Sequence, residues 1–147
     1  LDNPKTEDMA SWNSFPTRIA PMLDMILSLC DSYKIKATFF CLGWVAERYP
    51  HLIKLIYTRG HYIGTHGYAH QLVYKQSPEQ FRNDLRRSID ILFSITKSPI
   101  TMYRAPGFSI TKESLWAFDI LCEEGITIDS SVFPASRSHG GLTIFNK

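Results

Sequence analysis

Segments patterned like β-strands alternate with segments patterned like helices along most of this 147-residue chain. The clearest strand is 35–42, a nearly continuous run of β-branched and aromatic residues of the kind found in strands covered on both faces. The clearest helix is 16–33, in which apolar side chains recur at helical spacing. Further strands are predicted at 61–65, 100–104 and 126–130, and further helices at 44–59, 78–96 and 113–124.

This alternation predicts the fold class. Strands that follow one another at intervals of about 25 to 40 residues, with a helix between them, indicate parallel strands joined by crossover helices. The chain is therefore predicted to be an α/β protein, built as a barrel or an open sheet. Residues 1–147 are predicted to form one domain, because no long linker or low-complexity tract divides them. We expect this domain to be incomplete at both ends of the chain, since no strand precedes the first helix and the segment after Pro134 does not close the sheet.

Composition excludes several classes of protein. The content of 44% hydrophobic and 20% charged residues is typical of a globular domain. A net charge of +2 is too small to indicate nucleic acid or another polyanion as a partner. The longest apolar runs fall short of the roughly 20 residues that a membrane-spanning helix needs. No signal peptide is recognisable after Leu1, so the compartment stays open between the cytoplasm and the cell envelope of a bacterium.

Two histidines follow a predicted strand, at the end where parallel α/β folds bind ligands. His66 and His70 come directly after strand 61–65. They are predicted to lie on one face of a helical turn, with Gly67 allowing a sharp bend, so that both imidazoles reach a single divalent metal ion. The alternative is a pair of ordinary surface or core histidines.

Arg104 and Asp129 end the next two predicted strands. Arg104 precedes a rigid Ala-Pro-Gly turn and is suited to bind a carboxylate through two hydrogen bonds, although a structural salt bridge explains it equally well. Asp129 is suited to orient a histidine or bind a metal, or else to cap a turn with the following serines. The sequence contains neither a glycine-rich phosphate loop nor a Gly-x-Ser-x-Gly motif, so nucleotide cofactors and serine-hydrolase chemistry are not indicated.

Four segments together resemble the NodB-homology polysaccharide deacetylases, carbohydrate esterase family 4, and most closely their exopolysaccharide-associated branch. They are ATFFCLGWVAERYP (37–50), GHYIGTHGYAHQLVY (60–74), YRAPGFSITKESLWA (103–117) and IDSSVFP (128–134). The resemblance implies a deformed (β/α) barrel that hydrolyses N-acetyl groups on an N-acetylated polysaccharide or oligosaccharide and releases acetate. It also implies a divalent metal bound by one aspartate and two histidines, most commonly zinc, with cobalt, manganese and nickel as alternatives.

The resemblance assigns roles to individual residues of this sequence. His66 and His70 match the two histidine ligands of the metal. Arg104 matches an arginine set against the catalytic base, and Gly107 matches the residue whose backbone N–H binds the oxyanion. Asp129 matches the aspartate that orients the catalytic histidine. The residues predicted to bind substrate are Phe133, at a position where many relatives carry a groove-lining tryptophan, and Tyr68, for which packing in the core is the favoured alternative.

Two parts of the family pattern are missing from this sequence. The motif that supplies the catalytic base and the aspartate ligand belongs on a strand before helix 16–33, and we expect it upstream of Leu1. Asp2, Glu7 and Asp8 lie near that place but in polar sequence without a strand. The motif that carries the catalytic acid histidine is also missing, and His139 is interpreted as a surface histidine. We therefore expect the chain alone to bind metal weakly and to be nearly inert.

Two other functions fit the same sequence. One is a non-catalytic carbohydrate-binding module that keeps an aromatic groove without the chemistry, and the other is a hydrolase of a different non-peptide amide. The sequence leaves the glycan, the metal and the oligomeric state open.

Overall fold

A computed structural model describes residues 9–136 and 140–143. The chain divides into two compact units, Leu1–Ile35 and Lys36–Lys147. The first contains η1 (Met9–Ser14), a 3₁₀ helix that was not predicted, and α2 (Ile19–Ser32), which confirms the predicted helix 16–33. At the end of α2, the amide of Ile35 donates to the carbonyl of Cys30 at 2.9 Å.

The second unit contains a parallel sheet. Within the described residues, β1 (Thr38–Cys41), β2 (Tyr62–Thr65), β3 (Met102–Tyr103) and β4 (Ile128–Asp129) lie in the order β1-β2-β3-β4. Every neighbouring pair is parallel, and Cys41, Thr65, Tyr103 and Asp129 form one row across the sheet. The predicted α/β class with parallel strands is confirmed, although each strand is shorter than its predicted segment. Closure of the sheet into a barrel stays a prediction.

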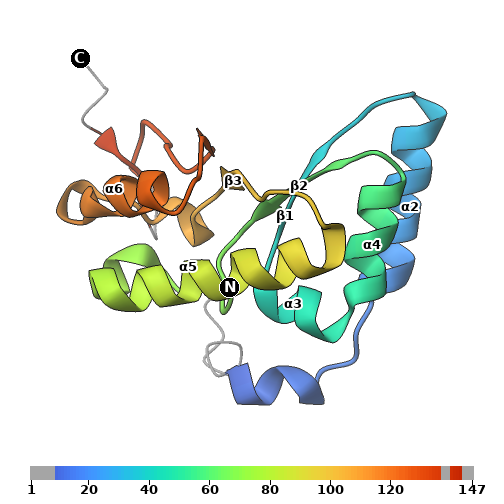
Figure 1. The fold of residues 1–147 in the computed structure, drawn as a ribbon, viewed down its shortest axis with the longest axis horizontal. Helices are drawn as coiled ribbons and strands as arrows, with labels where there is room; N and C mark the ends of the chain where they lie inside the picture. Colours follow the sequence, from blue (N-terminus) through green and yellow to red (C-terminus); the bar gives the residue numbers. More distant parts are fainter. Residues whose placement is uncertain (1–8, 137–139, 144–147) are drawn as a thin grey trace. The chain divides into compact units, whose positions relative to one another are not determined.

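Helices connect the strands on one face of this sheet. They are α3 (Gly43–Arg48), α4 (Pro50–Thr58), α5 (Pro78–Thr96) and α6 (Trp116–Glu123), with short 3₁₀ turns η2 (Val73–Lys75), η3 (Pro106–Phe108) and η4 (Lys112–Ser114). Because strand order follows chain order and parallel crossovers are right-handed, successive helices fall on the same side. Figure 1 shows α5 running past α3 and α6 there. The predicted single helix 44–59 was wrong, since Pro50 has no N–H to continue the helical ladder.

The longest helix, α5, is fixed by strong local signals at its start. Ser77 accepts a hydrogen bond from the amide of Gln80 at 3.2 Å, and the Gln80 side chain accepts one from the amide of Ser77 at 2.8 Å. This capping box satisfies two amides that a helix start leaves without partners, and Pro78 at the first helical position needs no partner. These signals explain why the predicted start of the helix at Pro78 agrees with the observed one.

Replacing Ser77 by alanine is expected to lower the free energy of unfolding by about 1 kcal/mol, because the amide of Gln80 loses its acceptor. Chemical denaturation of the protein measures this loss. Ser94→Ala is the matched control, since Ser94 is exposed on the same helix and bonds only the carbonyl of Ile91. An equal loss in both variants would contradict a capping role for Ser77.

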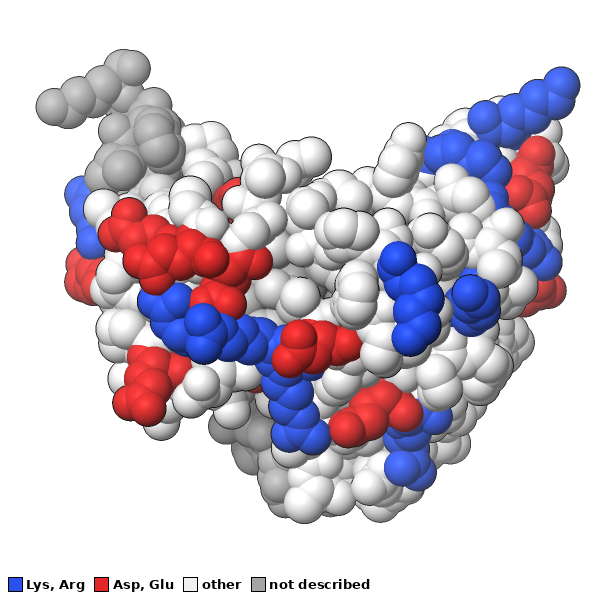
Figure 2. All heavy atoms as spheres, in the orientation of Figure 1, with Lys and Arg blue, Asp and Glu red and all other residues white. Residues whose placement is uncertain are grey.

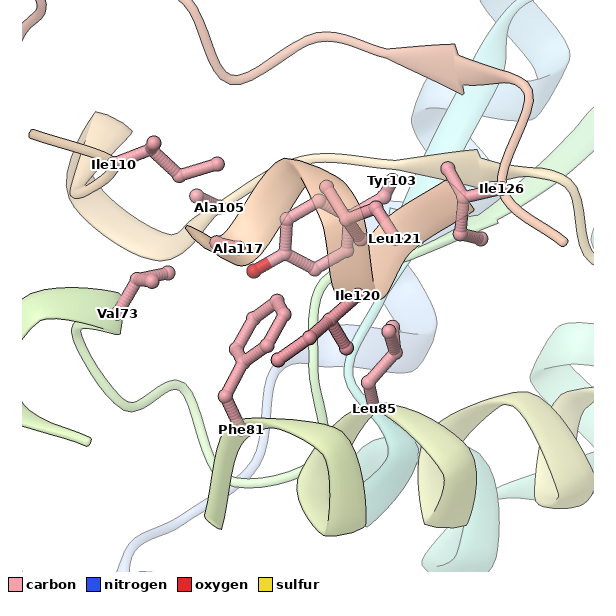
Figure 3. Close-up of a cluster of buried hydrophobic side chains, with 10 residues drawn as sticks. All are labelled: Val73, Phe81, Leu85, Tyr103, Ala105, Ile110, Ala117, Ile120, Leu121 and Ile126. Carbon is pink, nitrogen blue, oxygen red and sulfur yellow. The ribbon is translucent and has the colours of Figure 1, made fainter. Parts of the chain in front are cut away.

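The main core lies between α5, β3 and α6. Figure 3 shows its buried side chains, which come from these three elements and from the segments that adjoin them: Val73, Phe81, Leu85, Tyr103, Ala105, Ile110, Ala117, Ile120, Leu121 and Ile126. Phe81 meets Tyr103 edge-on, with ring centroids 5.9 Å apart, and Trp116 in the same manner at 5.6 Å. This core holds β3 against α5, and so fixes the carboxyl end of the sheet, where the predicted site residues lie.

Charges on the outer side of α5 and α6 are mixed. Arg82 bonds Glu123 and Glu124, and Arg86 bonds Glu124 at 2.6 Å. Figure 2 shows acidic and basic side chains interspersed over these helices. The Glu124 side chain is only 9% exposed, so its ion pairs are partly shielded from solvent and join α5 to α6. None of the helices in the described part of the chain combines the length and apolar character needed to cross a bilayer.

Candidate functional site

The loop after β2 carries both predicted metal ligands. The prediction of a helical turn was wrong, because Gly67 and His70 adopt left-handed backbone conformations, with φ of 74° and 55°. The loop nevertheless brings the two imidazoles together, with ring centroids of His66 and His70 5.1 Å apart and the planes at 65°. A left-handed histidine persists only where its surroundings hold it. The closeness that the spacing predicted is therefore achieved by an irregular loop.

The His66 ring is oriented by a neighbouring strand. Its Nδ1 lies 2.6 Å from the carbonyl oxygen of Arg104, and because a carbonyl only accepts, Nδ1–H is the donor. Nε2 then carries the lone pair, which is the arrangement usual for a metal-binding histidine. Burial lowers the pKa of His66 to about 4, and burial also lowers the pKa of His70. Both imidazoles are consequently neutral near pH 7, the state that binds metal.

Asp84 was missed by the sequence interpretation. From α5 its carboxylate accepts hydrogen bonds from the amides of Tyr68 at 2.7 Å and Ala69 at 3.2 Å, between the two histidines. Burial raises the pKa of Asp84, against these two hydrogen bonds, which lower it. An acidic residue on the buried face of a predicted amphipathic helix is the signal that would have found it.

Tyr68 was predicted to contact substrate, with core packing as the alternative. It is 6% exposed, and its hydroxyl donates to Glu47 at 2.6 Å. The Arg87 guanidinium lies 3.7 Å from the centroid of its ring. These contacts favour packing, and a role in substrate binding stays a prediction.

Arg104 links β3 to the end of β4. Its Nε donates to the carbonyl of Ser130 at 3.2 Å, and its Nη2 donates to the hydroxyl of Ser130 at 2.5 Å. The guanidinium also lies 4.6 Å from the centroid of the Phe40 ring, a cation–π arrangement. That ring lies over Gly64, where a Cβ atom would come within 2.7 Å of it. These partners are a serine and an aromatic ring, so pairing of Arg104 with a carboxylate stays a prediction.

Asp129 caps a turn with the serine residues that follow it, which was the alternative interpretation of this residue. It accepts hydrogen bonds from the amide of Ser131 at 2.9 Å and from the hydroxyl of Ser131 at 2.5 Å. The same hydroxyl accepts from the amide of Ala105 at 2.8 Å, which ties the segment after β4 to the segment after β3. Asp129 therefore helps to hold two predicted site segments together, and its predicted action on a catalytic histidine stays untested.

Gly107 and Phe133 lie on these two segments. Gly107 is exposed and left-handed at φ 61°, and its predicted role as an oxyanion donor stays untested. The half-buried Phe133 ring lies 5.4 Å from that of Phe108, so two aromatic side chains stand together at the predicted substrate wall. Contact between Phe133 and substrate also stays a prediction.

The carboxyl edge of the sheet thus gathers the predicted residues. His66 bonds the Arg104 segment, and that segment bonds the turn that Asp129 forms. Among the described residues, no group of three histidine, cysteine, aspartate or glutamate side chains is placed to hold a metal ion. The two histidines fit part of a ligand set and need a further ligand from elsewhere. Asp2, Glu7, Asp8 and His139, considered in the sequence analysis, lie outside the described residues.

Fold and site together define an α/β protein with a pair of neutral histidines at the carboxyl edge of a parallel sheet. The chain belongs to the polysaccharide deacetylase family, whose profile matches residues 8–120. The resemblance to NodB-homology deacetylases is confirmed, whereas membership of the exopolysaccharide-associated branch stays a prediction.

Curated relatives and solved structures agree with this assignment. The chain is 29% identical over 117 residues to a peptidoglycan-N-acetylglucosamine deacetylase of Bacillus cereus, covering 71% of this chain and 42% of the relative. It is 29% identical over 110 residues to a peptidoglycan deacetylase of Helicobacter pylori, covering 73% and 36%. A solved structure from Mycobacterium smegmatis superposes with a TM-score of 0.70 at 27% identity, covering 82% of this chain and 43% of that one. The chain spans less than half the length of each.

Proposed function

We propose that the protein hydrolyses N-acetyl groups on a glycan, releases acetate and depends on a divalent metal ion. The observation that carries this proposal is the His66–His70 pair. Two neutral imidazoles lie beside each other at the sheet edge where α/β proteins bind ligands, and the Nε2 of His66 is left with its lone pair. Family membership supplies the reaction type.

His66 and His70 would hold the metal together with a ligand from outside the described residues. Zinc is the metal that best suits imidazole and carboxylate ligands in a hydrolase, and cobalt, manganese and nickel are the alternatives. When bound, such an ion polarises a carbonyl oxygen and lowers the pKa of a bound water towards neutrality.

The chain's own residues would bind and orient the substrate. The backbone N–H of Gly107, on the turn after β3, would donate to the oxygen that becomes negatively charged when an N-acetyl group is attacked. Arg104 would keep the segments after β3 and β4 in register through Ser130, and Phe133 would supply an apolar surface for a sugar ring. The catalytic base and acid would come from outside the described residues.

A cell-wall glycan is the substrate class that we propose first. The curated relatives named above are peptidoglycan deacetylases, and the substrate of one of them carries N-acetylglucosamine. An exopolysaccharide, as the branch resemblance implied, is the second glycan to test. An N-acetylated cell-wall glycan and an N-acetylated exopolysaccharide present the same acetamide group to the site. The two substrates would therefore differ in chain length and in the groups beside the acetamide, and the reaction would be the same.

Acetate release from peptidoglycan and from a chitooligosaccharide by the intact protein tests this proposal. We expect release to fall to a small fraction after chelation and to return when zinc is added back, because the histidines then regain their ion. Mass spectrometry of the glycan, which loses one acetyl group per turnover, gives an independent measure. Full activity after exhaustive chelation would contradict the metal requirement, and no acetate from any N-acetylated glycan would contradict the reaction.

A further inference from the structure

Two successive backbone amides of the loop between the two histidines donate to one carboxylate. Asp84 accepts from the amides of Tyr68 and Ala69, two successive donors, at 2.7 and 3.2 Å. Bonds between backbone amides and an ionised carboxylate are stronger than those between neutral groups. An irregular loop has no helix or sheet ladder to satisfy its amides, so such a partner largely decides its path.

Gly67 makes room for this carboxylate. A Cβ atom at Gly67 would lie 2.7 Å from Oδ2 of Asp84, closer than Cβ atoms approach other atoms, and φ at this position is 74°. The glycine between the histidines therefore does more than permit a bend. Its missing side chain lets α5 bring a carboxylate against the loop.

Other backbone groups of the loop bond to the start of α3 and to the end of β2. The carbonyls of Gly67 and Tyr68 accept from the amides of Gly43 and Trp44, at the start of α3, at 2.9 and 3.1 Å. The amide of Gly67 donates to the hydroxyl of Thr65 at 3.2 Å.

That hydroxyl in turn lies 2.7 Å from the hydroxyl of Ser88, one helical turn beyond Asp84 on α5. α5 thus holds the loop through two side chains on the same face, and α3 holds it through backbone amides.

We infer that Asp84 is a positioning residue for the histidine pair: it fixes the loop path that keeps the His66 and His70 rings together without itself contacting a metal. The inference rests on the proposed function. The His66 ring has a second support, the carbonyl of Arg104, whereas the left-handed His70 directly follows the amides that Asp84 binds. Loss of Asp84 therefore releases His70 first.

Asp84→Asn in the intact protein tests this role. The variant keeps the size of the side chain but replaces one acceptor oxygen with an NH₂ group, so one loop amide loses its partner. Zinc titration is expected to show an affinity about 10- to 100-fold weaker, the range for residues that support metal ligands. Hydrogen exchange at the amides of Tyr68 and Ala69 is expected to accelerate.

Ser77→Ala and Asp90→Asn are the matched controls. Ser77→Ala destabilises the same helix without touching the loop, and Asp90 is exposed on that helix. Both are expected to bind zinc like the wild type. Zinc affinity in Asp84→Asn equal to that of the wild type, or no weaker than in Ser77→Ala, overturns the inference alone. A wild-type protein that binds neither zinc nor cobalt, manganese or nickel overturns the proposed function and this inference with it.

Discussion

Replacement of His66 by alanine in the intact protein is expected to lower kcat/KM for acetate release by at least about 1000-fold, because a metal ion contributes several kcal/mol of transition-state stabilisation. Of the two histidines, His66 has the stronger evidence for a role as a metal ligand. Its ring is oriented by the carbonyl of Arg104, and its pKa of about 4 keeps it neutral over the pH range in which the enzyme would work. Steady-state kinetics with a chitooligosaccharide, together with zinc titration, measures the effect.

His51→Ala is the matched control for this substitution. His51 is an exposed histidine on α4, and its replacement is expected to leave both kcat/KM and zinc affinity within a factor of about two, as for surface changes away from a site. Unchanged zinc affinity in His66→Ala would show that His66 is no ligand. Loss of activity with unchanged zinc affinity would assign it a role in catalysis other than metal binding.

Local signals let the sequence predict some elements fully. The start of α5 was predicted from Ser77 as the N-cap with Glu79 and Gln80 in the first turn, and Ser77 and Gln80 bond each other. The strands were predicted too long, because a strand extends only as far as a neighbour pairs with it. Residues 100–104 carry the strand pattern, yet only Met102–Tyr103 pair with β4. Pairing depends on distant segments, and a single run of residues contains no information about it.

The functional site, too, was only partly predictable from local sequence. The place of His66 and His70 at the carboxyl edge follows from the parallel direction of the strands, which the alternation of elements predicted. The loop conformation does not, because it depends on Asp84, which is 16 residues beyond Tyr68. The position of Asp84 on the buried side of a helix was readable, but its partners were not. Because Asp84 bonds backbone amides, the identities of the residues that it binds do not reveal it, and only the neighbouring Gly67, which leaves room for the carboxylate, reflects its presence.

The second large effect concerns the core that supports this site. Phe81→Ala is expected to lower the free energy of unfolding by about 3 to 5 kcal/mol, the range for removal of a buried aromatic ring. Phe81 is 2% exposed, and its ring lies edge-on to Tyr103 and Trp116, so its loss leaves a cavity between α5, β3 and α6. Chemical denaturation followed by fluorescence measures the change.

Phe93→Ala, on the same helix, is the matched control, because Phe93 is 48% exposed and its loss opens no buried cavity. A loss below about 1 kcal/mol is expected there. The comparison also bears on the site, since α5 carries Asp84 and Ser88 as well as Phe81. If the core holds α5 in place, Phe81→Ala should speed exchange at the amides of Tyr68 and Ala69, while Phe93→Ala leaves it unchanged. Equal stability losses in the two variants would contradict the role of this core in holding α5, and with it the dependence of the histidine loop on the core.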